Sequence, residues 1–214
     1  MDQEKLNAIT DVILAVIAGS FALLLFLKRV GISSPAADLC LFGWGAFFTA
    51  LATAALIAAF DHAYAIGTRH ESILDRVGAI CGATITVIAF FQGTFAFGGK
   101  TFAIRMSVIP VLLYLVFVVI NVIRYRYVIT SIYGTLCYAG AMVFYLMALA
   151  NGVPTLFFIV GIVIFIAGLV IQPTRLKILW LNHNDLYHIC IIASSFFLVK
   201  GVFVLDRFFV LSGM

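Results

Sequence analysis

Residues 37–60 read ADLCLFGWGAFFTALATAALIAAF, a run in which Asp38 is the one charged residue. A helix that crosses a membrane needs about 20 mainly apolar residues, so this run is long enough to cross. The seven runs of this kind are Ala8–Leu27, Ala37–Phe60, Ile73–Ala96, Phe102–Ile123, Val128–Ala150, Thr155–Ile171 and Leu186–Val204. They are continuously apolar, which excludes the alternating strands of an outer-membrane barrel. We expect an all-α integral membrane protein, a seven-transmembrane-helix bundle that forms one domain over residues 1–214.

The composition excludes the other broad classes of protein. Of 214 residues, 64% are hydrophobic and 10% are charged, whereas a soluble domain is about 45–50% apolar and about 25% charged. The net charge of +4 comes from basic residues scattered at the ends of apolar runs. That distribution is typical of membrane anchoring and excludes a nucleic-acid patch, which would be clustered. The cysteines lie inside apolar runs and are interpreted as reduced core residues.

The chain ends and loops predict an orientation. The segment Met1–Leu6 carries Asp2 and Glu4 against Lys5, so it lacks the basic head of a cleaved signal peptide, and we expect the first span to be retained. If seven spans alternate, six or seven Lys and Arg residues lie on the side of the N-terminus and five on the other. This difference predicts a cytoplasmic N-terminus.

The polar residues that carry chemistry gather on one side of the expected membrane. Seven alternating spans place all four histidines on the same side, and four of the nine acidic residues lie within a few residues of them. They are His62, His70, His183, His188, Asp61, Glu71, Asp75 and Asp185. Ionisable groups at membrane depth are costly and are usually functional. The alternative is that these groups lie at headgroup level only because that level is hydrated.

Helical geometry narrows this group to residues on three spans. His62 ends the second expected span, whereas Asp75 and His188 each lie about one turn into theirs. Imidazoles and a carboxylate from three helices are the ligands of a catalytic zinc site, which keeps one position for water. The metal lowers the pKa of that water toward neutrality and makes it a nucleophile. The sequence therefore predicts a metal site at this end of the bundle.

The position of each remaining histidine or acidic residue decides whether it is expected in the metal site. Asp185 is three residues before His188, so both share a helix face. His183 is five residues before His188, about 140° away around a helix, and is interpreted as an interfacial anchor. His70 and Glu71 are interpreted as solvated loop residues.

Three short motifs resemble a known superfamily. They are Phe60-Asp61-His62 at the end of the second span, Ile73-Leu74-Asp75-Arg76 early in the third, and Asn184-Asp185-Leu186-Tyr187-His188 at the start of the seventh. Their order resembles the superfamily of alkaline ceramidases, progestin and adiponectin receptors and haemolysin III-like proteins (the CREST superfamily). The resemblance implies a seven-helix core, zinc held by three histidines, an aspartate close to the metal water and, in several members, hydrolysis of lipid amides.

Two positions depart from this pattern. Ala58 stands where the family usually has a serine, and Asn184 stands where it has a further histidine. The resemblance then implies two imidazoles, His62 and His188, with Asp75 or Asp185 completing the set. Weaker zinc binding, another metal and loss of the metal all remain open.

These patterns lead to one expected function and one alternative. The expected function is a membrane-embedded hydrolase that depends on Zn²⁺ and acts on a lipid amide or ester, with Asp75 as the base or water-orienting group. The alternative is a non-catalytic protein of the same fold, such as a receptor, scaffold or transporter. The expected partners are membrane lipids and a lipid-like substrate, with no nucleic acid.

Two further charged residues lie inside expected spans. Asp11 lies about one turn into the first, on the histidine side, where it either orients an imidazole or interacts with the helix dipole. Lys200 resembles the retinal-binding lysine of microbial rhodopsins, but the supporting third-span pattern of that family is missing. We interpret it as a side chain that reaches the far interface.

Overall fold

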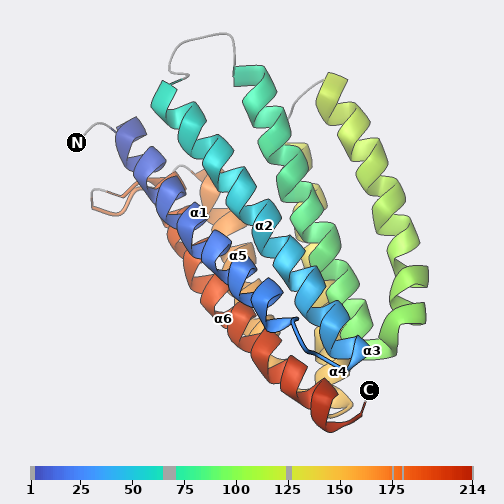
Figure 1. Cartoon of the computed structure of the whole chain (residues 1–214). Helices are drawn as coiled ribbons and strands as arrows, with labels where there is room; N and C mark the ends of the chain where they lie inside the picture. The colour runs from blue at the N-terminus through green and yellow to red at the C-terminus, as the bar shows by residue number, and fades with distance from the viewer. Residues whose placement is uncertain (1–2, 65–70, 124–126, 175, 180, 214) are drawn as a thin grey trace.

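The computed structural model describes residues 3–64, 71–123, 127–174, 176–179 and 181–213. The elements are α1 (Gln3–Lys28), α2 (Pro35–Tyr64), α3 (Glu71–Ile123), α4 (Tyr127–Ala150), α5 (Leu156–Ile171), the short 3₁₀ helix η1 (Gln172–Thr174) and α6 (His183–Leu211) (Figure 1). Over the described ranges the chain forms no β-strand, and its one isolated bridge joins Ile178 to Leu181. The all-α prediction is confirmed for this part of the chain.

The expected third and fourth spans both lie within α3. This element covers 53 residues and contains two helical segments that meet at a kink at Gly99 (φ 74°, ψ −176°). The ribbon turns back on itself within α3 (Figure 1). The predicted count of seven helices is therefore not confirmed. The described residues form six α-helical elements, one of which, α3, contains both expected spans joined through Gly99.

Most of these helices are long and apolar enough to cross a membrane. Among the described residues, five meet this condition by length and composition: α1, α2, α3, α4 and α6. The sixth, α5, has 16 residues. Large apolar side chains of the second half of α3, such as Ile109 and Leu112, are exposed at the surface, as expected where lipid replaces water. The protein is therefore a multi-pass membrane protein, and the side of its N-terminus stays a prediction.

Helix starts and turns follow local sequence signals. The Oγ of Ser34 accepts a hydrogen bond from the backbone N–H of Ala37 at 3.1 Å. Pro35 is the first residue of α2, where a missing N–H has no cost. Between α4 and α5, Gly152 has a φ of 81°, a left-handed conformation that glycine adopts without strain.

An aromatic stack holds the middle helices together. The rings of Trp44 (α2) and Phe158 (α5) are stacked with centroids 5.1 Å apart. Tyr145 (α4) stacks on Phe158 at 4.7 Å. All three side chains are fully buried. Offset aromatic pairs of this kind add about 0.5–1.5 kcal/mol each beyond burial, so the stack fixes how α2, α4 and α5 pack.

Polar contacts at both ends show that α1 and α6 run parallel. Lys28, at the end of α1, forms an ion pair with Asp206, near the end of α6. Asp11, near the start of α1, lies against His188, near the start of α6. His62, near the end of α2, approaches the same Asp11. The starts of α1 and α6 and the end of α2 therefore meet at one end of the bundle, where the polar residues gather.

Candidate functional site

One face of α1 presents three polar side chains to its neighbours. Asn7, Thr10 and Asp11 have i, i+3 and i+4 spacing, which places them on the same helix face. Asn7 and Asp11 are buried, and the same face continues into the core through Leu14 and Ala18. Helix α1 thus carries a buried polar patch at one end of an otherwise apolar contact surface.

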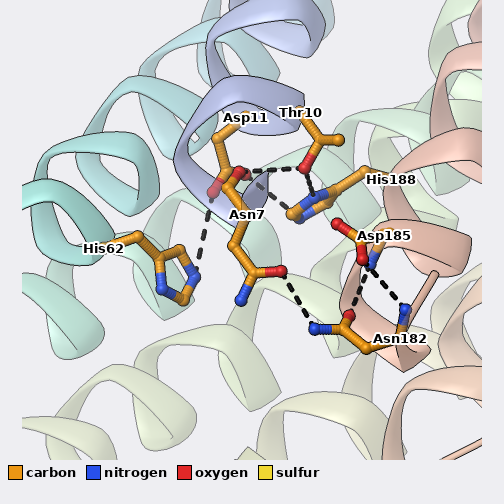
Figure 2. Close-up of polar contacts among 7 residues, drawn as sticks. All are labelled: Asn7, Thr10, Asp11, His62, Asn182, Asp185 and His188. Atoms are coloured by element: carbon orange, nitrogen blue, oxygen red, sulfur yellow. Dashed lines mark hydrogen bonds and ion pairs between the residues drawn. The ribbon is translucent and has the colours of Figure 1, made fainter. Parts of the chain in front are cut away.

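The carboxylate of Asp11 lies between two imidazoles from different helices (Figure 2). Its Oδ1 is 3.0 Å from Nε2 of His188 on α6. Its Oδ2 is 3.9 Å from Nε2 of His62 on α2. Asp11 is only 1% exposed, and Oδ2 accepts no hydrogen bond from the described residues. Three helices therefore bring two imidazole nitrogens and a carboxylate together.

A hydrogen-bond chain orients the imidazole of His188. The Oγ1 of Thr10 donates to the backbone carbonyl of Asn7 at 2.9 Å, and it lies 2.9 Å from Nδ1 of His188. A hydroxyl has one proton to donate, so when Thr10 donates to the Asn7 carbonyl, Nδ1 of His188 is the donor to Thr10. This assignment from the hydrogen-bond network places a proton on Nδ1 and directs Nε2 at Asp11.

Asp185 caps the start of α6. Asn182 and Asp185 form a capping box: the Asn182 side chain accepts from the Asp185 backbone N–H, and the Asp185 carboxylate accepts from the Asn182 backbone N–H, both at 2.9 Å. Asn182 also donates to the side chain of Asn7 at 3.2 Å. Such a box satisfies backbone donors that the first turn of a helix leaves open.

A cavity of about 330 Å³ lies beside this network. Its polar lining includes Asp11, His62, Asp75, Asn184 and His188. The structure thus brings three of the predicted site residues, His62, Asp75 and His188, into one cavity. Asp185 and His183 do not line it. His70 falls outside the described residues, as does the side chain of Glu71.

All six α-helices line the cavity, which also has apolar walls and further polar residues such as Thr86 and Ser131. Its walls include Leu51, Ile85, Phe165 and Ile191, and glycines such as Gly82 leave room along α3. Tyr138, one of the aromatic residues of α4, also lines it. Ligand pockets combine mainly apolar walls with a few polar groups. A cavity that joins charged and polar groups to apolar walls suits a molecule with a polar head and an apolar chain.

The remaining sequence candidates lie elsewhere. Lys200 is exposed, with its Nζ 6.0 Å from the ring centre of Phe157. Within the described ranges, no three His, Cys, Asp or Glu side chains already have the arrangement of a metal site. The cysteines are free thiols, buried or half-buried.

Comparison with known families gives a single match. A family model described as a family of unknown function (DUF6962) matches residues 6–206. The chain belongs to the DUF6962 family. Neither a curated protein nor a solved structure matches it. All the cavity residues named above, from Asp11 to Ile191, lie inside the part of the chain that the DUF6962 model matches.

Analysis of the sequence missed three residues of this network in the DUF6962 chain: Asn7, Thr10 and Asn182. One signal for the first two was available, because they share a helix face with Asp11 in a mainly apolar run. A signal for Asn182 was its position three residues before Asp185, the spacing of a capping box.

Proposed function

We propose that this DUF6962 protein is a membrane-embedded, zinc-dependent hydrolase of lipid amides or esters, related to the alkaline ceramidase superfamily that its motifs resemble. The observation that carries the proposal is the cavity. It joins His62, Asp75 and His188 to apolar walls large enough for part of an acyl chain. A hydrolase of membrane lipids needs both parts: polar groups at the scissile bond and an apolar surface that holds the chain in place.

The proposed bundle has seven crossings. The two halves of α3 that meet at Gly99 would each cross once, and α5 with its 16 residues would supply a short crossing of about 24 Å. The slight excess of Lys and Arg on the side of the N-terminus, counted over all the loops, favours a cytoplasmic N-terminus. The cavity residues would then lie near the cytoplasmic surface.

The residues of the cavity fit a zinc ion chemically. Imidazole nitrogens and carboxylate oxygens are zinc ligands, and His62, His188 and Asp75 supply both types. A buried carboxylate oxygen without a hydrogen-bond donor, as found at Oδ2 of Asp11, is stabilised by a nearby cation. When bound, zinc supplies a Lewis acid and makes water a nucleophile at neutral pH.

The protein's own groups have three tasks in this proposal. Thr10 holds the imidazole of His188 in one orientation through Nδ1. Asp75, on α3 at the cavity wall, accepts the proton of the attacking water and passes it to the leaving group. The apolar walls exclude bulk water and hold the acyl chain, which keeps the carbonyl group next to the polar end.

A second candidate is a non-catalytic lipid-binding protein with the same fold. Ala58 and Asn184 both line the cavity, and both stand where the superfamily has groups used in its chemistry. Under this alternative the cavity would bind a lipid without cleaving it, as a receptor or transporter does.

An assay of lipid hydrolysis separates the two candidates. Protein purified in detergent would be incubated with N-acyl amides and fatty acyl esters, and the released fatty acid measured by mass spectrometry. We expect release that a chelator abolishes and added zinc restores. Asp75→Asn should abolish release, whereas Lys200→Ala, on the outer surface, should retain it. Binding of the lipid without release in any of these conditions would favour the non-catalytic alternative.

A further inference from the structure

We propose that Asp11 is a metal ligand that takes the place left by the missing histidine at Asn184. The ligand set would then be two histidines and one carboxylate: His62 of α2, His188 of α6 and Asp11 of α1. This inference rests on the proposed function, because it assumes that the cavity binds a metal. It changes the role of α1 from a packing helix to part of the site.

The carboxylate of Asp11 offers one oxygen to each of the two imidazoles. Two atoms that each lie about 2.0–2.1 Å from a tetrahedral zinc ion are about 3.3 Å apart. Oδ1 of Asp11 lies 3.0 Å from Nε2 of His188, and Oδ2 lies 3.9 Å from Nε2 of His62. The two contacts use different oxygens, so the side chains would have to move to share one ion, and the His62 side chain is about one-quarter exposed.

The orientation of His188 provides a second argument. Since its Nδ1 donates to Thr10, the Nε2 of a neutral ring directs a lone pair at a carboxylate oxygen only 3.0 Å away. Two acceptors at this distance need a positive charge between them, either a proton or a metal ion. A proton would explain the His188 contact alone. A metal ion also explains why the second imidazole nitrogen, that of His62, faces the other oxygen.

The hydrogen bond to Thr10 is what a metal-bound histidine requires. A ligating imidazole almost always donates its other ring N–H to an oxygen, which fixes its orientation. Thr10 accepts this bond and donates its own hydroxyl hydrogen bond to the Asn7 carbonyl. Asn7, Thr10 and Asp11 therefore act together: two residues orient the ligand on α6, and the third completes the ligand set.

The other carboxylates have different positions. Asp185, predicted from the sequence to be a ligand, is 0% exposed, and its carboxylate accepts the Asn182 backbone N–H within the capping box. Asp75 lines the cavity from α3. With Asp11 as the third ligand, Asp75 keeps its proposed role as the proton acceptor.

Metal content and absorption spectra of Asp11 variants test the inference. Asp11→Asn keeps the shape and a hydrogen-bonding side chain but is a poor ligand, whereas Asp11→Cys offers a thiolate, a good ligand for zinc and cobalt. Asp206→Asn is the matched control, since Asp206 is an equally buried carboxylate at the far end of α6. Each purified variant would be loaded with zinc or with cobalt, and its size-exclusion profile compared with that of the wild-type protein.

We expect Asp11→Asn to lower zinc affinity by more than about 100-fold, beyond what loss of a residue that only orients a ligand causes. Asp206→Asn should keep wild-type affinity. Asp11→Cys loaded with cobalt should show a thiolate-to-cobalt absorption band that the wild-type protein lacks, even if Asp11→Asn fails to fold.

Two results would overturn the inference. One is Asp11→Asn protein that binds zinc as tightly as the wild-type protein. The other is Asp11→Cys protein that binds cobalt without the thiolate band. Either result leaves a site at His62 and His188 and so spares the proposed function. Wild-type protein that binds neither metal would instead contradict the proposed function itself.

Discussion

The carboxylate of Asp11 on the first helix lies 3.0 Å from the imidazole of His188 on the last. The neighbouring hydrogen bond from His188 to Thr10 joins residues 178 positions apart. The Asp11–His188 contact lies near the start of α1 and α6, and the Lys28–Asp206 ion pair lies near the far end of the same two helices. Helix α1 therefore lies beside α6 along its whole length. The polar groups that α1 carries are consequently buried where α2 and α6 supply imidazoles.

Replacing single histidines should separate ligands from neighbours. His62→Ala and His188→Ala each remove an imidazole nitrogen directed at Asp11, so both should abolish bound metal. His183→Ala is the matched control, because His183 lies on α6 but does not line the cavity, and its metal content should match that of the wild-type protein. Elemental analysis of the purified variants checks this. Metal lost from His183→Ala and kept by His188→Ala would place the site at the other face of α6.

The capping box at the start of α6 should affect stability without affecting metal binding. Asn182→Ala removes the side-chain acceptor of the first turn and should lower the free energy of unfolding by about 0.5–2 kcal/mol. Asp185→Ala removes the reciprocal acceptor and should also keep the metal. Unfolding in detergent measures the change in stability, and elemental analysis measures the bound metal. The control is Asn151→Ala, a substitution at an exposed residue. Loss of metal from Asp185→Ala would show that Asp185 is a ligand after all.

Filling the cavity should reduce turnover and leave the metal in place. A Cβ added at Gly82 meets no atom within 4 Å, and Gly82 lines the cavity. Gly82→Leu would therefore occupy space meant for the acyl chain and lower the hydrolysis rate by on the order of tenfold or more. Gly82→Ala, with a single methyl group, should have a much smaller effect. An unchanged rate for Gly82→Leu would show that substrate does not enter this cavity.

The turn within α3 should depend on glycine. Gly99 has φ 74° and ψ −176°, a region that only glycine occupies without strain, and other residues there cost about 1–3 kcal/mol. Gly99→Ala should lower the free energy of unfolding by this amount. Gly82 lies on the same element, where the backbone is helical, so Gly82→Ala should not lower the free energy of unfolding. Denaturation of both variants in one detergent compares them. Equal stability would mean that the chain does not require this conformation.

Much of the helical layout could be predicted, because apolar runs of membrane length are a strong signal. The expected span Leu186–Val204 corresponds to α6, which the structure extends to His183 and Leu211, since polar caps and interfacial residues continue a helix beyond its apolar part. The break expected between the third and fourth spans falls at Gly99, where two helical segments meet at a kink. The conformation of this glycine produces it.

The site was harder to predict than the fold. His62, Asp75 and His188 could be selected because polar residues are rare in spans, and they line one cavity. The contacts of Asp11 depend on how α1 packs against α6, which no local pattern encodes. For Asp185, i,i+3 spacing favoured a shared face with His188, but a local bond to the Asn182 backbone directs the side chain into the cap.

The zinc content of wild-type protein purified in detergent tests the central claim most directly. The account predicts about one equivalent of zinc per chain, removed by a chelator and restored by reloading, because the two imidazoles and the carboxylate of one cavity form a single site. Protein with well under half an equivalent of metal, unchanged after exposure to excess zinc, would contradict it.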